Sequence, residues 1–129
     1  MPTKRSRQGS QQASERSHVG LTVPRPIKAR LLEAAAALEW SAGDWVLAAA
    51  AEHGPRLCTH LGDQQVRRRP RVEDAAFTAL YLTPDERDEL DDQAIACRLN
   101  RSAFVTSVAA LALGDEMEVV LARLLDRTP

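Results

Sequence analysis

Residues 77–86 read FTALYLTPDE, an alternating apolar segment followed at once by a helix start signal. Leu80 and Leu82 occupy alternate positions, as in a short strand with one buried face. Thr83 and Glu86 form a capping-box pattern, in which the threonine side chain covers the helix N-terminus and the glutamate reaches back. The segment therefore predicts a strand from about 77 to 82 and a helix that begins at 84.

The chain beyond this strand has the spacing of two helices. Apolar residues recur at helical intervals from about 84 to 97 and again from about 102 to 113, with a polar turn at 98–101 between them. The stretch from 115 to 126 carries a further apolar stripe, which predicts a short additional helix.

The same pattern occurs 59 residues earlier. A shift of that length, without a gap, places Leu21 on Leu80, Leu31 on Leu90 and Trp45 on Phe104; Val23, Ala35, Val46 and Ala50 also fall on apolar residues. The earlier copy predicts a strand at about 18–23, a helix at about 26–39 and a second helix that closes near 53–54. We therefore expect a duplicated strand-helix-helix unit.

The two units divide the chain into five segments. The first, 1–17, lacks apolar periodicity and is rich in Ser, Gln and positive charge, which is typical of a disordered basic arm. The first unit is 18–54, a basic linker follows at 55–76, the second unit is 77–114, and a C-terminal helix and tail occupy 115–129.

Length and composition limit the classes of protein that fit. A chain of 129 residues holds one small domain, so an enzyme with separate cofactor and substrate domains is excluded. Two cysteines form no framework of the kind found in small secreted domains, and we expect neither a signal peptide nor a membrane span, because the first residues lack an apolar stretch and no run approaches about 20 apolar residues. A reducing bacterial cytoplasm is the expected setting.

One unit of about 36 residues is too small to bury an adequate core or to pair its own strand. We expect the two strands to pair antiparallel, with Val19, Leu21 and Val23 facing Leu80 and Leu82 over a helical core. The predicted fold class is therefore mainly α, with a short two-stranded antiparallel β-ribbon. Such a ribbon fits the major groove of B-DNA, where its outward side chains meet base edges.

The segments LTVP at 21–24, LYLTPDE at 80–86 and LNRSAFV at 99–105 resemble the ribbon-helix-helix family of Arc, MetJ and CopG type, which are small prokaryotic DNA-binding proteins. The resemblance covers 19–54 and 78–114. Most members carry one copy and dimerise, whereas this chain carries two, similar to the TraY-type conjugative accessory proteins. The expected arrangement is a tandem pseudo-dimer in one chain.

The resemblance implies two sets of DNA contacts. Outward strand residues would face the bases, namely His18, Gly20, Thr22, Phe77, Ala79 and Tyr81. The start of each second helix would hold phosphates, namely Ser41, Ala42 and Gly43 in the first unit, and Asn100, Arg101 and Ser102 in the second.

Positive charge precedes both strands, although the formal net charge is only −1. Residues 1–17 carry four Lys or Arg against one Glu, while 85–92 carry six acidic residues against one Arg. We expect the basic segments to contact phosphates, through Lys4, Arg5, Arg7, Arg67, Arg68, Arg69 and Arg71. The acidic run is expected to be a solvated helix face directed away from the DNA.

Other chemistry is less well supported. His53, Cys58, His60 and Asp63 do not have the spacing of a zinc site, and the sequence contains no phosphate loop or nucleophile elbow. We expect no metal, no cofactor and no enzymatic activity. Trp40 and Trp45 are predicted to be core residues, and Cys97 a free, buried and inert thiol.

The expected function is sequence-specific binding of double-stranded DNA, as a repressor or a plasmid maintenance or transfer factor, with a homodimer or higher oligomer forming on the DNA. The alternative is an antitoxin-like or adaptor module that binds a protein through its linker or C-terminal helix. The apolar Phe77, Ala79 and Tyr81 favour this alternative, and weak or absent binding to random duplex DNA would distinguish it.

Overall fold

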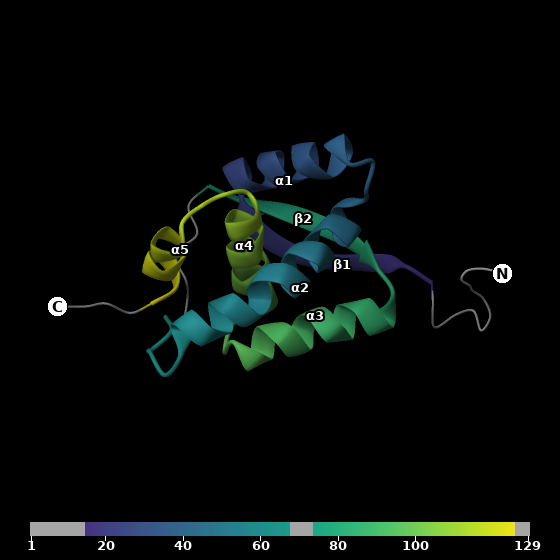
Figure 1. Ribbon diagram of the computed structural model, residues 1–129. Coiled ribbons are helices and arrows are strands. Elements are labelled where there is room, and N and C mark those ends of the chain that lie inside the picture. Colours follow the sequence, from purple (N-terminus) through teal and green to yellow (C-terminus); the bar gives the residue numbers. More distant parts are fainter. Residues whose placement is uncertain (1–14, 68–73, 126–129) are drawn as a thin grey trace.

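The computed structural model describes residues 15–67 and 74–125, which form a two-stranded antiparallel sheet and five helices (Figure 1). The order along the chain confirms the predicted strand-helix-helix succession in both units and the additional C-terminal helix. The elements are β1 (Ser17–Pro24), α1 (Arg25–Ala37), α2 (Ala42–Leu61), β2 (Ala75–Leu82), α3 (Pro84–Ala96), α4 (Arg101–Ala112) and α5 (Met117–Leu124).

The strands β1 and β2 pair within one chain, although 50 residues separate the end of β1 from the start of β2. Their register places Ser17 opposite Leu82, Gly20 opposite Ala79 and Pro24 opposite Ala75. One face of this ribbon is buried and contributes Val19, Leu21, Val23, Ala76, Thr78, Leu80 and Leu82 to the interior. The predicted alternation is confirmed, so the intervening side chains face outward.

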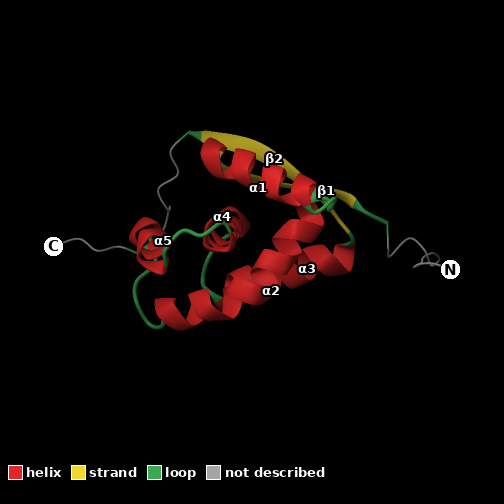
Figure 2. Ribbon diagram, turned by 45° about the horizontal axis from the view of Figure 1, so that its top comes forward, coloured by secondary structure: helices red, strands yellow, loops and turns green. Residues whose placement is uncertain are grey.

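The interior is built around α4. Every residue of this helix from Ala103 to Leu111 is buried, including the polar Thr106 and Ser107, so α4 is surrounded on all sides. Figure 2 shows α4 nearly end-on, with α1, α2 and α5 around it and the ribbon above. In Figure 1, α1 and α3 lie on opposite sides of the ribbon.

The first helix of each unit ends in the same way. Glu39 and Arg98 follow α1 and α3 in the left-handed region, with φ of 60° and 62°. The next N–H in each case donates back across the turn at 2.9 Å, from Trp40 to the Ala35 carbonyl and from Leu99 to the Ala94 carbonyl. These equivalent residues lie 59 positions apart, so the local structure repeats at the interval found in the sequence.

The predicted end of the second helix near Gly54 is wrong, because α2 continues to Leu61. Pro55 lies inside this helix and removes one backbone hydrogen bond, at a typical cost of about 3 kcal/mol. Leu57 and Leu61 are fully buried, and each contributes about 1.5–3 kcal/mol. Their burial offsets the cost of the proline, and the segment between the units begins at Gly62 rather than at residue 55.

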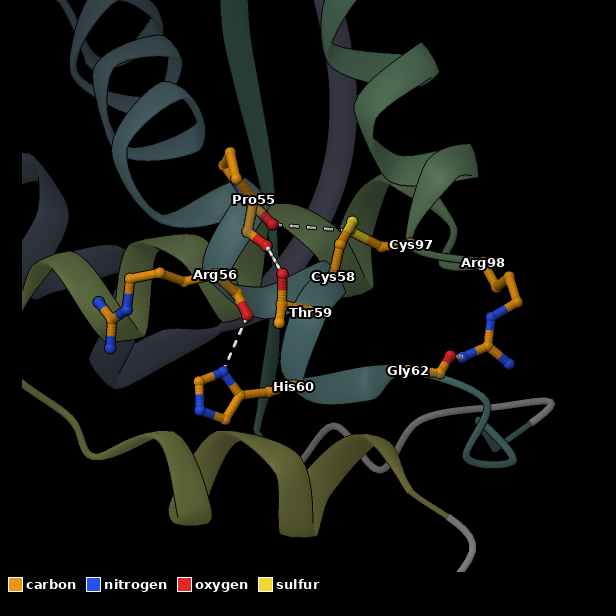
Figure 3. Close-up of a disulfide and its surroundings, with 9 residues drawn as sticks. Pro55, Arg56, Cys58, Thr59, His60, Gly62, Cys97 and Arg98 are labelled. Carbon is orange, nitrogen blue, oxygen red and sulfur yellow. Dashed lines mark hydrogen bonds between the residues drawn. A yellow bond between two sulfur atoms is a disulfide. The ribbon is translucent and has the colours of Figure 1, made fainter.

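The prediction that Cys97 is a free thiol is also wrong, although the residue is buried as expected. Cys97 forms a disulfide with Cys58, with the two Cα atoms 4.9 Å apart (Figure 3). Beside it, the Arg98 guanidinium donates to the carbonyls of Gly62 at 2.6 Å and Gln64 at 2.9 Å. The disulfide joins the part of α2 beyond Gly54, residues 55–61, to the end of α3.

The two tryptophans differ in environment, so the prediction that both are core residues holds only for Trp45. Trp45 is 7% exposed, whereas Trp40 is 47% exposed. In the second unit, the end of α2 lies beside the corresponding turn, because Arg98 donates to the Gly62 and Gln64 carbonyls, and Leu99, the counterpart of Trp40, is 6% exposed. α4 ends at Ala112 and the chain turns into α5, so it does not extend over Trp40 in the same way.

Candidate nucleic-acid interface

The six residues predicted to contact bases gather on the outward face of the ribbon. They form three directly opposed pairs across the strands, which are His18 with Tyr81, Gly20 with Ala79, and Thr22 with Phe77. Phe77 is 68% exposed and Tyr81 53% exposed, while Ala79 is half-buried. The structure thus brings together on one surface residues that the sequence places 55 to 63 positions apart.

The side chains on this face also contact one another. A ring nitrogen of His18, Nε2, is hydrogen-bonded to the Tyr81 hydroxyl, and the two rings meet edge to face with centroids 4.5 Å apart. The Phe77 ring lies over Gly20. A Cβ added to Gly20 would lie only 3.0 Å from the Cε1 atom of Phe77. The outward face therefore has a polar aromatic pair at one end and an apolar ring toward the other.

The N-termini of α2 and α4 lie against opposite edges of the ribbon. Beside β2, a Cβ added to Gly43 at the start of α2 would lie 2.8 Å from the Tyr81 carbonyl oxygen. Beside β1, the Thr22 N–H donates to the Ser102 hydroxyl at the start of α4, at 2.9 Å. A helix start therefore flanks the outward face on each side. Gly43 is buried against the strand, and only glycine fits there because a side chain would collide with it.

At the start of both α2 and α4, a side-chain cap binds one backbone N–H, and the N–H groups before it have no partner inside the helix. Ser41 accepts from the Asp44 N–H at 3.1 Å, and Asn100 accepts from the Ala103 N–H at 2.7 Å. The caps satisfy the third helical position in each case, while the N–H groups of the first two positions have no intrahelical carbonyl. Such groups, with the positive end of the helix dipole, form a ready anion site.

Three cationic side chains reach the edges of the ribbon. Arg101 donates to the Gly20 carbonyl at 3.1 Å, Arg16 to the Tyr81 carbonyl at 3.1 Å, and Lys28 to the Phe77 carbonyl at 2.9 Å. The predicted contacts include Arg101 but not Arg16 or Lys28. Their positions could have indicated a role, because Arg16 directly precedes the first strand and Lys28 lies in the first turn of the helix after it.

Carboxylates neutralise two of these cations. Asp91 binds Arg101 through two hydrogen bonds of 2.8 Å, and Arg16 lies 3.3 Å from Asp44 and 3.6 Å from Glu86. The hydrogen bond from Arg101 holds the pKa of the Asp91 carboxyl below its ordinary value of 3.8, so the pair is ionised at neutral pH. Exposed ion pairs contribute only about 0.2–1 kcal/mol, so a phosphate could compete for these cations.

The acidic run on α3 is only in part the solvated face that was expected. Its exposed members are Asp85, Asp88, Glu89 and Asp92. Glu86 instead accepts from the Thr83 N–H at 2.9 Å, which confirms the predicted capping box. Asp91 pairs with Arg101 beside the edge of β1, and Glu86 lies 3.6 Å from Arg16 beside β2, so two carboxylates of this helix stand close to the candidate interface.

Of the residues in the basic segments that are predicted to contact phosphates, the structure describes only Arg67. Its N–H donates to the Leu124 carbonyl at 2.7 Å, and the neighbouring Val66 forms a β-bridge with Leu125. The start of the basic run is therefore held against the end of α5. Lys4, Arg5, Arg7, Arg68, Arg69 and Arg71 lie outside the described residues.

Over residues 15–67 and 74–125, no group of three or more His, Cys, Asp or Glu side chains is placed to hold a metal ion. No helix in these two ranges has the length and apolar composition needed to span a bilayer. Comparison with protein-family models, curated proteins and solved structures finds no match for the chain. The geometry of the ribbon is therefore the basis for inferring what the chain does.

Proposed function

We propose that the chain is a tandem ribbon-helix-helix protein that binds double-stranded DNA sequence-specifically, by inserting β1 and β2 into the major groove. The observation that carries this proposal is the exposed outward face of the ribbon with a helix N-terminus on each edge. The major groove is about 12 Å wide, and paired strands lie about 4.8 Å apart, so a two-stranded ribbon fits it.

The strand register supports a pseudo-twofold arrangement of the two units. Gly20 lies opposite Ala79, which is also its counterpart 59 residues later, so a twofold axis would pass between these two residues. The contact of Gly43 with Tyr81 corresponds by the same offset to the contact of Ser102 with Thr22. In this arrangement one chain supplies what two subunits supply in a dimer.

The flanking groups suit the sugar-phosphate backbones on either side of the groove. The N-terminus of α2 would face one backbone and that of α4 the other, which would fix the register of the ribbon on the duplex. Lys28 adds positive charge beside β2, and Arg16 and Arg101 would add more where a phosphate displaces their carboxylate partners. The basic segments before β1 and β2 would extend these contacts along the phosphates.

A small ribbon protein that binds DNA suits a repressor or a plasmid maintenance or transfer factor in a bacterium. We propose this role, with further copies assembling on adjacent DNA sites.

Replacing Ala79 by Glu tests the interface. Ala79 lies at the middle of the outward face, so a carboxylate there would oppose DNA at every sequence. Ala51→Glu is the matched control, because Ala51 is exposed on α2. Fluorescence anisotropy with labelled duplexes should show binding lost in Ala79→Glu and kept in Ala51→Glu, with both variants folded by circular dichroism. Equal binding by the two variants would contradict a ribbon interface.

One observation favours a second candidate, a protein-interaction module of antitoxin or adaptor type. Phe77 and Tyr81 are large, exposed aromatic side chains, which are enriched at protein interfaces, and two nearby cations are already paired. Such a module would show no binding to random duplex DNA at low salt, and it would lose its protein partner on Phe77→Ala.

A further inference from the structure

The two ends of the ribbon's outward face carry different chemistry. His18 and Tyr81 stand at one end, Thr22 and Phe77 at the other, and Gly20 opposite Ala79 in the middle. A homodimer would present identical groups at both ends of its ribbon. Because two different strands build this face, its halves offer a DNA duplex different contacts.

The end formed by His18 and Tyr81 is a hydrogen-bonding end. The ring nitrogen of His18 and the Tyr81 hydroxyl bind each other, which fixes both side chains edge to face. Whichever partner donates this bond, the pair retains one further polar hydrogen, on the other ring nitrogen or on the hydroxyl. Purines present the N7 acceptor in the major groove, whereas cytosine presents only a donor, so this end suits a purine over cytosine.

The end formed by Phe77 is apolar. Its ring is 68% exposed and lies over Gly20, because glycine has no side chain that would occupy the space of the ring. A phenyl ring offers no hydrogen bond to a base edge, but it packs well against the C5-methyl group of thymine. Neighbouring Thr22 adds a methyl and a hydroxyl group. This end therefore suits thymine.

On the basis of the function proposed above, we infer that the DNA site is non-palindromic, with a purine read by His18 and Tyr81 and a thymine read by Phe77. The positions from 18 to 22 span about 14 Å at about 3.4 Å per residue. This length corresponds to about four base-pair steps of roughly 3.4 Å along a strand. The middle of the site would meet Ala79 and the part of the Phe77 ring that lies over Gly20, neither of which can hydrogen-bond, so it would be read weakly.

Selection of bound sequences from a random duplex pool, with the full chain, tests this inference. We expect an asymmetric consensus with a thymine on one side. Replacing that thymine by deoxyuridine removes one methyl group and should weaken binding about fourfold, the equivalent of about 0.8 kcal/mol per buried carbon. Phe77→Ala should erase the difference between the two duplexes. Tyr81→Phe should keep the difference between the thymine and deoxyuridine duplexes, but should lose the preference for a purine at the other end of the site.

A palindromic consensus, or a thymine-deoxyuridine difference that persists in Phe77→Ala, would overturn the inference and leave the proposed function intact. Failure to recover any duplex, even at low salt, would overturn the proposed function itself. The deoxyuridine comparison uses the unaltered protein, so it does not depend on a variant folding correctly.

Discussion

Loss of the disulfide between Cys58 and Cys97 should destabilise the fold by a predictable amount. The bond joins residues 39 positions apart and so closes a long loop in the unfolded chain. The chain-entropy model gives about 4 kcal/mol at 25 °C for a loop of this length. Domains of this size have a total free energy of unfolding of about 5–15 kcal/mol, so the bond would supply a large share.

Urea titration measures this contribution directly. With a slope of about 2 kcal/mol per molar urea, the unfolding midpoint should fall by about 2 M when a reductant is added. Cys58→Ser with Cys97→Ser should behave like the reduced protein and be insensitive to reductant. A midpoint that reductant leaves unchanged, together with two titratable thiols in the folded protein, would refute the link between α2 and α3.

Three further substitutions test the local structure. Asp91→Asn should lower the free energy of unfolding by at most about 1 kcal/mol and should strengthen DNA binding at low salt, because it frees Arg101. Arg101 lowers the pKa of Asp91, so the stability gained from the pair is present above pH 3.8 and is lost as the pH falls through the lowered pKa. The urea midpoints of the parent and of Asp91→Asn should therefore converge in acid. Thr83→Ala should cost about 1 kcal/mol through the lost helix cap, and an unchanged urea midpoint would contradict the capping box. Gly43→Ala should cost about 1–3 kcal/mol, since its Cβ would lie 2.8 Å from the Tyr81 carbonyl oxygen, and a stability equal to the parent's would refute that close approach.

Local signals in the sequence were sufficient to predict most of the fold. The alternation around Leu21 and Leu80 determines which strand residues are buried, and the capping box at Thr83 and Glu86 marks a helix start to the residue. The 59-residue repeat then predicts that the strands pair. Because alternate residues of a strand face opposite sides, the outward face followed from the buried one.

Contacts between distant segments could not be predicted in this way. No spacing rule reveals that Cys58 meets Cys97, because their approach depends on α2 running past Pro55. The exposure of Trp40 likewise depends on where α4 ends. The pairing of Asp91 with Arg101 joins two helices whose angle the sequence does not specify.

Titration of the full chain with a short random-sequence duplex over a range of salt concentrations tests DNA binding most directly. Cations on both ribbon edges and in the basic segments predict binding at low salt, with a log-log slope of about −0.9 for each phosphate contacted. Anisotropy should therefore show an affinity that falls steeply as salt rises for the parent chain, and no binding for Ala79→Glu. Absence of binding at the lowest salt concentration would contradict the account.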